Sequence, residues 1–388
     1  MEFNLAQHMN LSSFKAMDVM RVAQQLEAEG RSICHLEIGQ PATPAPVPAR
    51  ADLRARMDDA ETHGYTVALG LPALRERISG LYGRWYGKSI APERVVLTVG
   101  SSLGFIMAML ACFERGARIA LPSPGYPAYR NLSRVLGLQP VDVPVDASQN
   151  WRLSVEDLAR MSPQPDGLIL ASPANPTGVM LSEDELKDIA LWCQSNGVRL
   201  ISDEIYHGLT YDRPATSLVD VTPDLIVVNS FSKYFSMTGH RIGWMIIPEG
   251  LRDPIERLAQ NLVISAPTLS QYAALAVLSD PTSFDELDRH VARYRSHRDY
   301  LLQHLPAAFL GDFPSPDGAF YLYADITALG QTSTEISQAL LAEAGVAATP
   351  GIDFDPVRGD AYLRLAYARE TAEIEEACRR ITAWMAGR

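Results

Sequence analysis

Short apolar runs alternate with amphipathic segments through the first three quarters of the chain. The runs are rich in β-branched residues, and polar or turn residues bound each of them. Runs of this kind are typical of strands that are buried on both faces of a parallel sheet. They predict strands at residues 94–99, 117–122, 166–172, 199–204, 224–230 and 244–248.

The segments between these runs have a helical period. The clearest begins at Ser182, which forms a capping-box pattern with Glu185, and it ends at Gly197, a residue type that often follows a helix. Its apolar residues recur at the spacing i, i+3, i+4, i+7. Alternating strands and helices predict one large doubly wound α/β domain over residues 45–285. In such sheets, ligands bind beyond the carboxyl ends of the strands.

The final quarter of the chain has a different pattern. A long, charged amphipathic helix is followed by strand-like stretches at 318–326 and 361–369 and by a closing helix. This mixture predicts a smaller α+β domain over residues 286–388. Residues 1–44 contain one more helical pattern. Periodicity does not decide which domain it packs on, and we expect it to contribute to the small one.

The composition of the chain argues against several classes of binding partner. The chain has 388 residues and a net charge of −12, which argues against non-specific binding to nucleic acid or to an anionic membrane. Its four cysteines are far apart and show no metal-ligand spacing, so we expect reduced thiols in a cytoplasmic protein and no metal site. We find neither a signal-peptide pattern nor an apolar run long enough to span a membrane.

Candidate chemistry lies at the ends of the predicted strands. Ser101 and Ser102 follow a glycine between a strand and an apolar helix, where free amides and hydroxyls suit a phosphate. Tyr126 lies in a turn rich in proline and glycine, where it belongs either to the core or to a stacking site. Asn175 begins "NPTG", which alone also fits an ordinary turn.

The later strand ends carry ionisable groups. Asp203 ends a strand three residues before Tyr206, in a context that also suits a helix cap or a loop carboxylate. In "NSFSKYFSMTGHRIGW", Lys233 is the only lysine. Ser230 precedes it by three residues and Arg241 follows it by eight. This arrangement fits either a solvated loop or a site where an amine bonds an aldehyde beside a bound phosphate.

Taken in order, these stretches resemble the fold-type I pyridoxal-phosphate enzymes of aminotransferase class I/II, the aspartate aminotransferase superfamily. "SFSKYFSMTGHRIGW" is the most specific match, and "NPTG" and "SDEIY" follow the family's pattern. The resemblance extends from "HLEIGQPATPAP" to "YLRLAYA", which is nearly the whole chain. It implies a large domain with a mostly parallel sheet between helices, a smaller α+β domain and a homodimer with shared active sites.

The resemblance also implies roles around the cofactor, pyridoxal 5′-phosphate. Lys233 would form the internal aldimine with the cofactor's aldehyde and then carry the proton between carbons. Asp203 would keep the pyridine nitrogen protonated, so that the ring accepts electrons. Asn175 and Tyr206 would hydrogen-bond the ring's phenolic oxygen, and Tyr126 would stack on the ring.

Further matches concern the phosphate and the substrate. The expected phosphate contacts are Ser101, Ser102, Ser230 and Arg241, with Ser232 as a weaker candidate and Tyr65 reaching the phosphate of the partner subunit. Arg364 in "YLRLAYA" would clamp the substrate carboxylate with its planar fork. The backbone of Gly39 would approach the same carboxylate, and Asn175 would also contact the substrate.

Some positions depart from the family pattern. His240 stands where many relatives have tryptophan, and packing is the simpler reading for it. Some dicarboxylate-specific relatives have a lysine at the position of Ser102, so its absence weakens a preference for aspartate. The loop at 351–354 matches a loop near the site, without an assignable side-chain role.

The expected activity is transfer of an amino group from an L-amino acid to a 2-oxo acid, 2-oxoglutarate or pyruvate. A lyase or decarboxylase with the same cofactor is one alternative, because the sequence does not report which bond at Cα is aligned for cleavage. A non-catalytic sensor is a remote alternative. The residues before "LEIGQP" show no helix-turn-helix pair of the kind that such regulators carry.

Overall fold

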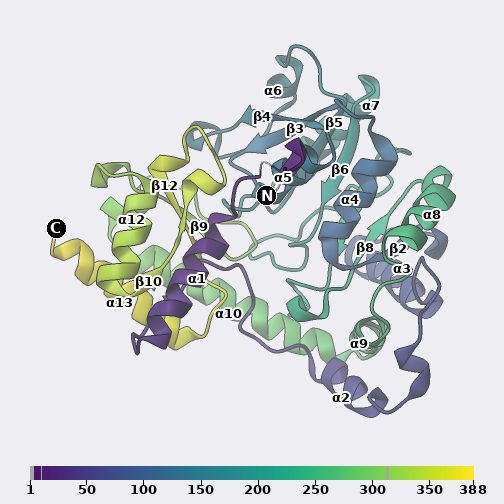
Figure 1. Ribbon diagram of the computed structural model, residues 1–388, viewed down its shortest axis with the longest axis horizontal. Helices are drawn as coiled ribbons and strands as arrows, with labels where there is room; N and C mark the ends of the chain where they lie inside the picture. The colour runs from purple at the N-terminus through teal and green to yellow at the C-terminus, as the bar shows by residue number, and fades with distance from the viewer. Residues whose placement is uncertain (1–3, 10, 312–313) are drawn as a thin grey trace.

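A seven-stranded sheet runs through the larger part of the molecule (Figure 1). The structure is a computed structural model that describes residues 4–9, 11–311 and 314–388. In pairing order the strands are β2 (Val95–Thr98), β8 (Gly243–Ile246), β7 (Ile226–Ser230), β6 (Arg199–Asp203), β5 (Gly167–Ala171), β3 (Arg118–Ser123) and β4 (Gln139–Pro144). The predicted α/β architecture with a mostly parallel sheet is confirmed.

Strand β8 runs against both of its neighbours, whereas the other neighbouring pairs, from β7 to β4, are parallel. We expected residues 244–248 to form another parallel strand, and that expectation is wrong. Only residues 231–242 join β7 to β8, and Ser230 pairs with Gly243. A parallel return needs a crossover of about a dozen residues or more, usually with a helix, and this link is only at that lower limit of length. This link holds only a short 3-10 turn, so the chain folds straight back.

Strand β4 was not predicted, because its sequence lacks the apolar pattern that marks the other strands. It reads "QPVDVP", with a proline at its second and last positions and a charged residue between them. Proline cannot donate to a strand ladder and is tolerated mainly at sheet edges. Within the described residues β4 pairs only with β3 and forms that edge of the sheet, so the prolines cost it no pairing on the open side.

Helices cover both faces of this sheet (Figure 1). One face carries α4 (Gly100–Cys112), α5 (Pro127–Val135) and α8 (Arg252–Leu262), and the other carries α3 (Pro72–Tyr86), α6 (Val155–Ala159) and α7 (Glu183–Ser195). Successive strand residues enter different cores, so Val227 packs on one side and Ile226 and Val228 on the other. The predicted capping box of Ser182 and Glu185 begins α7.

A second group of strands lies beside this sheet. β11 (Thr349–Pro350), β12 (Tyr362–Ala366) and β9 (Tyr321–Asp325) form an antiparallel sheet, and β1 (Cys34–His35) pairs with β10 (Val346–Ala347). The N-terminal helix α1 (Lys15–Ala28) packs on β10 and β11. The remaining helices are α2 (Val47–Arg56), α9 (Thr268–Ser279), α10 (Thr282–His304), α11 (Ala307–Leu310), α12 (Ser333–Ala339) and α13 (Thr371–Ala386).

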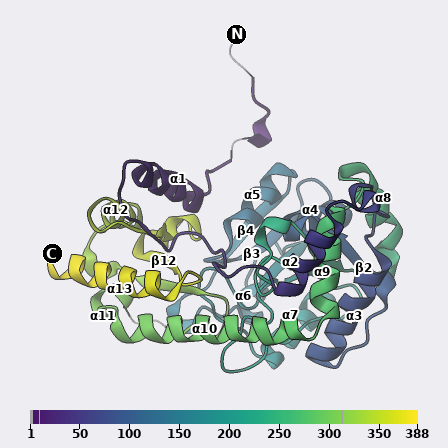
Figure 2. The same ribbon diagram turned by 90° about the horizontal axis from the view of Figure 1, so that it is seen from below.

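Helix α10 runs along one side of the molecule, past α13 at one end and toward α3 at the other (Figure 2). The boundary expected between residues 285 and 286 falls inside this helix. The domain limits therefore stay a prediction. Among the described residues, we find no helix with the length and apolarity that crossing a membrane requires.

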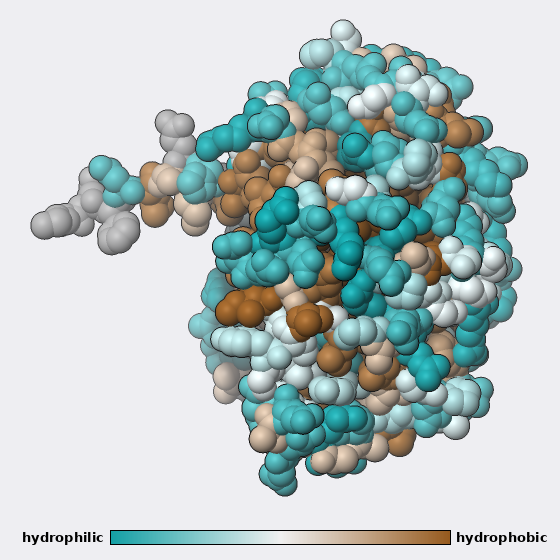
Figure 3. Space-filling model, turned by 90° about the vertical axis from the view of Figure 1, so that its right-hand side faces the viewer, coloured by the Kyte–Doolittle hydropathy of each residue, from teal (hydrophilic) through white to brown (hydrophobic). Residues whose placement is uncertain are grey.

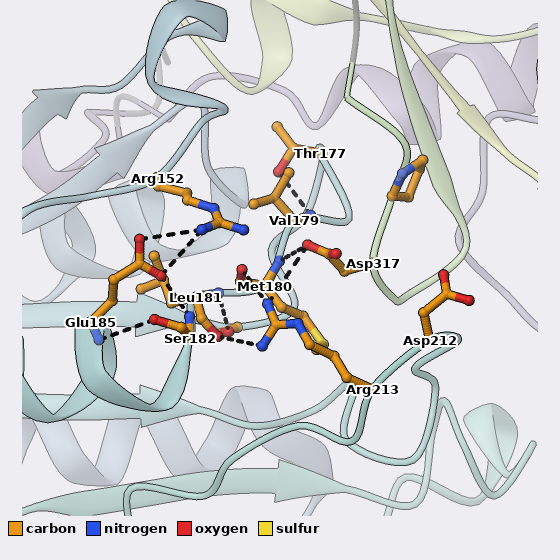
Figure 4. A network of polar contacts seen from close by, with 12 residues as sticks. Arg152, Thr177, Val179, Met180, Leu181, Ser182, Glu185, Asp212, Arg213 and Asp317 are labelled. Atoms are coloured by element: carbon orange, nitrogen blue, oxygen red, sulfur yellow. Dashed lines mark hydrogen bonds and ion pairs between the residues drawn. The ribbon is translucent and has the colours of Figure 1, made fainter.

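The turn after β5 is fastened to the segment that leads into β9 (Figure 4). The carboxylate of Asp317 accepts the amide N–H of Met180 at 2.9 Å, and Arg213 donates to the carbonyls of Met180 and Leu181. The amide of Gly318 donates to the carbonyl of Gly178. These bonds fix the loop that carries Asn175 against the start of β9.

We predict that Gly178→Ala destabilises the protein more than Gly197→Ala. Both glycines have a left-handed backbone, with φ of 70° and 69°. A Cβ at Gly178 would lie 2.6 Å from the Pro316 side chain, whereas Gly197 faces open space. The backbone term costs about 1–2 kcal/mol at either site, and overpacking adds about 1–3 kcal/mol at Gly178. Urea unfolding measures both, and equal losses would contradict a tight junction.

Candidate active site

A cavity of about 670 Å³ opens at the carboxyl edge of the seven-stranded sheet, where the two sheets meet. β5, β6 and β7 are parallel, so the residues that follow them share this edge. Most of the predicted site residues line the cavity: Gly39, Ser101, Ser102, Tyr126, Asn175, Asp203, Tyr206, Lys233, Arg241 and Arg364.

The amine of Lys233 projects into this cavity from the loop after β7. It is partly buried, and its Nζ donates a hydrogen bond to the carbonyl of Gly39 at 2.6 Å. Burial lowers the pKa of Lys233 to about 8, with help from the guanidinium groups of Arg364 and Arg241, while the Asp203 carboxylate acts in the opposite direction. Much more of this amine is therefore neutral and nucleophilic near neutral pH than of an ordinary lysine.

Asp203 is the last residue of β6, and its carboxylate is buried. Burial raises the pKa of Asp203 to about 6, and hydrogen bonds from Tyr129 and from the Ile205 amide oppose that rise. The Tyr129 hydroxyl donates to Oδ2, and the Ile205 N–H donates to Oδ1 at 3.0 Å. The sequence argument missed Tyr129. Its spacing of three residues from Tyr126 was the available signal, because both face the cavity from the start of α5.

Helix α4 begins at the wall of the cavity. Val99, which precedes the helix, provides no side-chain acceptor for the first amides, so those N–H groups remain available to an anion. Ser101 and Ser102 line the cavity in this first turn. The Arg241 guanidinium lies directly against Gly100, where a Cβ would collide with it. Amides, hydroxyls and a guanidinium together form a donor set that suits a phosphate.

The two serines before Lys233 occupy different places. Ser232 lines the cavity, whereas Ser230 is outside its lining. The Ser230 hydroxyl lies 2.8 Å from that of Ser232, donates to the Ile242 carbonyl, and accepts the Ser232 amide N–H. The structure thus places the weaker candidate at the cavity and the stronger one beneath it, as its support.

Arg364 is 2% exposed and lies at the junction of three segments. Its Nη1 donates to Asn175 Oδ1 at 3.1 Å, and its Nη2 donates to the Glu37 carbonyl and to the Thr349 hydroxyl. Its Nε has no hydrogen-bond partner among the residues that the structure describes. Within the described parts of the chain, no carboxylate pairs with this guanidinium. A buried charge without a counter-ion is costly, so the site is built for an anionic ligand.

Tyr206 and Tyr321 share a hydrogen bond of 2.8 Å between their hydroxyls at the cavity wall. The Arg364 guanidinium lies over the Tyr321 ring, 4.5 Å from its centre. The Tyr321 hydroxyl also occupies the space that a Cβ of Gly39 would need. This close approach explains a glycine at position 39. Sequence reasoning missed Tyr321, since it reads only as one residue of an apolar strand.

Two positions singled out from the sequence lie away from the cavity. Tyr65 is 79% exposed and does not line it. His240 is partly buried and also lies outside the lining, where burial lowers its pKa. The structure therefore brings together eleven of the predicted residues, with the weaker candidate Ser232 among them, and leaves Tyr65 and Ser230 apart from them.

Comparisons with known proteins match nearly the whole chain to aminotransferases. Residues 31–381 match the family model for aminotransferase class I and II. The chain is 42% identical over 374 residues to a valine–pyruvate aminotransferase from Mycobacterium tuberculosis, and the match covers 96% of each sequence.

Solved structures agree with this match. A crystal structure of an aminotransferase from Mycobacterium tuberculosis has a TM-score of 0.95 and 40% identity, with full coverage of both chains. The aspartate aminotransferase from Thermus thermophilus with maleate has a TM-score of 0.92 and 27% identity, and the match covers 98% of this chain and 100% of that one.

We predict that Lys233 reacts with aldehydes faster than an ordinary lysine does. At pH 8 about half of a group with a pKa of about 8 is neutral, against roughly 0.3% at the usual 10.5. Brief exposure of the ligand-free protein to propanal and cyanoborohydride, followed by peptide mass spectrometry, measures the labelling rate against pH. Lys187, whose pKa is raised by Glu183, is the internal control. Equal pH profiles for the two lysines would contradict the electrostatic argument.

Proposed function

The chain belongs to the aminotransferase class I and II family and is a transaminase with the fold-type I architecture, and from this premise we propose its substrates. The donor is an L-amino acid with an uncharged side chain. The acceptor is a 2-oxo acid, with pyruvate preferred over 2-oxoglutarate. The observation that carries this proposal is the charge of the cavity lining: among the described residues Arg364 is the one cation left for the substrate once Lys233 and Arg241 are assigned to the cofactor.

The cavity suits pyridoxal 5′-phosphate, the cofactor of this family. Uncapped amides of α4, the hydroxyls of Ser101 and Ser102 and the guanidinium of Arg241 would hold its phosphate. Tyr126, which lines the cavity edge-on to Tyr129, would pack on its ring. We also propose that residues 45–285 form the cofactor domain and that residues 286–388, with residues 1–44, form the smaller one.

The residues around the amine have distinct tasks. When bound, the cofactor supplies an aldehyde that bonds amines and a ring that accepts the electron pair from Cα. Lys233 would provide the tethering amine and, once released, take the proton from the substrate Cα at its Nζ. Asp203 would keep the ring nitrogen protonated. Asn175 and Tyr206, both at the cavity wall, would orient the ring by hydrogen bonds to its phenolic oxygen.

The walls around Arg364 favour uncharged side chains. Arg364 would bind the carboxylate that every amino acid and 2-oxo acid carries, with its fork of N–H donors. In the described lining, the only other cations are Lys233 and Arg241, both already assigned. Apolar and aromatic side chains form most of the remaining wall: Phe14, Met17, Ile38, Tyr126 and Tyr321. The valine–pyruvate activity in the name of the 42% identical relative supports the same choice.

A panel of amino acids tests this proposal. Valine, alanine, leucine, phenylalanine, aspartate, glutamate and lysine are each offered with pyruvate, and the new amino acid is measured by mass spectrometry. We expect neutral donors to exceed aspartate and glutamate by about tenfold or more, equivalent to about 1.4 kcal/mol. Lys233→Ala serves as the inactive control. If aspartate or glutamate is the best donor, or if no donor transfers its amine, the proposed substrate class fails.

We further propose a homodimer whose partner subunit completes each site. Tyr65 is 79% exposed, and Val67 and Ile264 are also exposed apolar residues. Their segments lie side by side, since the Thr66 amide donates to Ser265 and the Thr268 hydroxyl donates to Gly64. Apolar surface of this kind appears on the side of the molecule that carries α2, α8 and α9 (Figure 3). A second copy would bury it and bring Tyr65 to the partner's phosphate.

We predict that two impaired variants recover activity when mixed. Tyr65→Ala and Lys233→Ala protomers are allowed to exchange, and transamination is then measured. In a mixed dimer, one site carries both substitutions and the other carries neither, so the second site should be active and the mixture should exceed both parents. If exchange is confirmed by mass spectrometry and no activity returns, Tyr65 does not serve the partner's site.

A further inference from the structure

Helix α1 begins at the mouth of the cavity and is capped from far away in the sequence. Phe14, the residue before the helix, makes no capping bond through its side chain. Instead, the carboxylate of Asp353 accepts the amide N–H of Lys15 at 3.1 Å on Oδ1 and that of Ala16 at 3.4 Å on Oδ2. Asp353 is 8% exposed. A carboxylate at this end also interacts favourably with the helix dipole.

The first turn that Asp353 holds is part of the cavity wall. Phe14, Ala16 and Met17 all line the cavity. The Phe14 ring packs edge-on against Tyr126, with 6.1 Å between ring centres. The position of this turn therefore decides how far the mouth of the site is covered.

Few other contacts hold the cavity end of α1. In the first turn Ala16 is the only buried side chain among the described residues, and Met17 is 45% exposed. The larger apolar contacts lie further along the helix, where Val19 and Leu26 pack partly buried against the cluster that contains Ala23. Alanine buries little apolar area, so the two hydrogen bonds from Asp353 carry a large share of the attachment at the cavity end.

The short turn at 351–354 also touches the carboxylate clamp. Phe354, the residue after Asp353, presents its ring to the Arg364 guanidinium at 4.8 Å. The Phe354 carbonyl accepts the amide of Gly125, the residue before Tyr126. One turn thus contacts Arg364, the Tyr126 loop and the start of α1. The sequence left the role of this loop open. These contacts indicate that it connects the three elements around the cavity.

We propose that Asp353 is a positioning residue that anchors α1 over the cavity, so that Phe14 and Met17 cover a substrate whose carboxylate is held by Arg364. The anchoring of α1 by Asp353 does not depend on which reaction the protein catalyses. The effect of that anchoring on substrate binding rests on the proposed function. Through the 351–354 turn, the covering helix and the carboxylate clamp keep a fixed spacing. A substrate without a carboxylate would gain no benefit from this arrangement.

The test compares Asp353→Ala with Asp353→Asn in the full-length protein loaded with its cofactor. Asparagine keeps one acceptor oxygen for the shorter bond, from Lys15, and loses the longer one from Ala16, whereas alanine accepts neither. We expect amide deuterium exchange in the first turn of α1 to rise about 2- to 30-fold in Asp353→Ala and to rise less in Asp353→Asn. The KM for the amino donor should rise over the same range in the alanine variant, with little change in kcat and in cofactor affinity.

Two further variants keep the test decisive. Lys15→Pro leaves Asp353 in place and removes one of its two donors, at a helix position where proline is well tolerated. Phe14 already has an extended backbone that suits a following proline, so this variant should fold and loosen α1 in the same direction. Asp355→Ala is the matched control, because Asp355 accepts the amides of Val357 and Arg358 in the same loop without contacting α1.

The outcomes separate the two claims. Unchanged exchange in Asp353→Ala, or an equal rise in Asp355→Ala, overturns the anchor. A selective rise in Asp353→Ala and Lys15→Pro supports it, even if no amino acid is transaminated, in which case the proposed function alone fails. A selective rise in exchange with an unchanged KM overturns the part of the proposal that links α1 to substrate binding.

Discussion

The guanidinium of Arg364 is buried with no counter-ion from the described part of the chain, and the surrounding structure is arranged around that charge. Three segments far apart in sequence supply its hydrogen bonds: the loop after β5, the stretch after β1, and β11. Each segment belongs to a different strand assembly, so the guanidinium can be held only when all of them are in place. Neutral oxygens accept its hydrogen bonds and so offset part of the cost of burying the charge. An anionic ligand would form stronger, charge-assisted hydrogen bonds with the same guanidinium.

The second constraint is the shared edge of the parallel strands. Because β5, β6 and β7 run in one direction, the loops with Asn175, Asp203 and Lys233 meet at one place. The apolar runs and the polar residues that follow them were enough to predict this edge and the polar side chains along it, whereas Gly39 and Arg364 were reached only through the family resemblance. That success has a physical basis, since the strand period and the direction of a sheet depend on local pattern and connection length.

What the sequence did not reveal depends on contacts between distant elements. Tyr129 reads as an ordinary helical residue until α5 is docked beside β6 and its hydroxyl meets Asp203. Tyr321 reads as a core residue until β9 brings it to Tyr206. The reversed direction of β8 depends on a link with no crossover helix, a feature that apolar pattern alone does not report. In each case the outcome depends on which surfaces of distant elements pack together, and the periodicity of the sequence does not report that.

The stretch from Glu37 to Gly39 acts through its main chain. The Glu37 carbonyl accepts from Arg364, and the Gly39 carbonyl accepts from Lys233. Side-chain substitution leaves a carbonyl oxygen in place, so an alanine scan would report on the Glu37–His35 pair, the Ile38 wall and the steric intolerance of Gly39, and would leave both acceptors untested. Backbone chemistry would be needed to change these acceptors, for example a thioamide introduced by semisynthesis. During evolution, the hydrogen bonds from these carbonyls to Arg364 and Lys233 could likewise change only through a shift of the backbone. The position of the main chain in this short stretch therefore matters more for the two cations than the identity of its side chains.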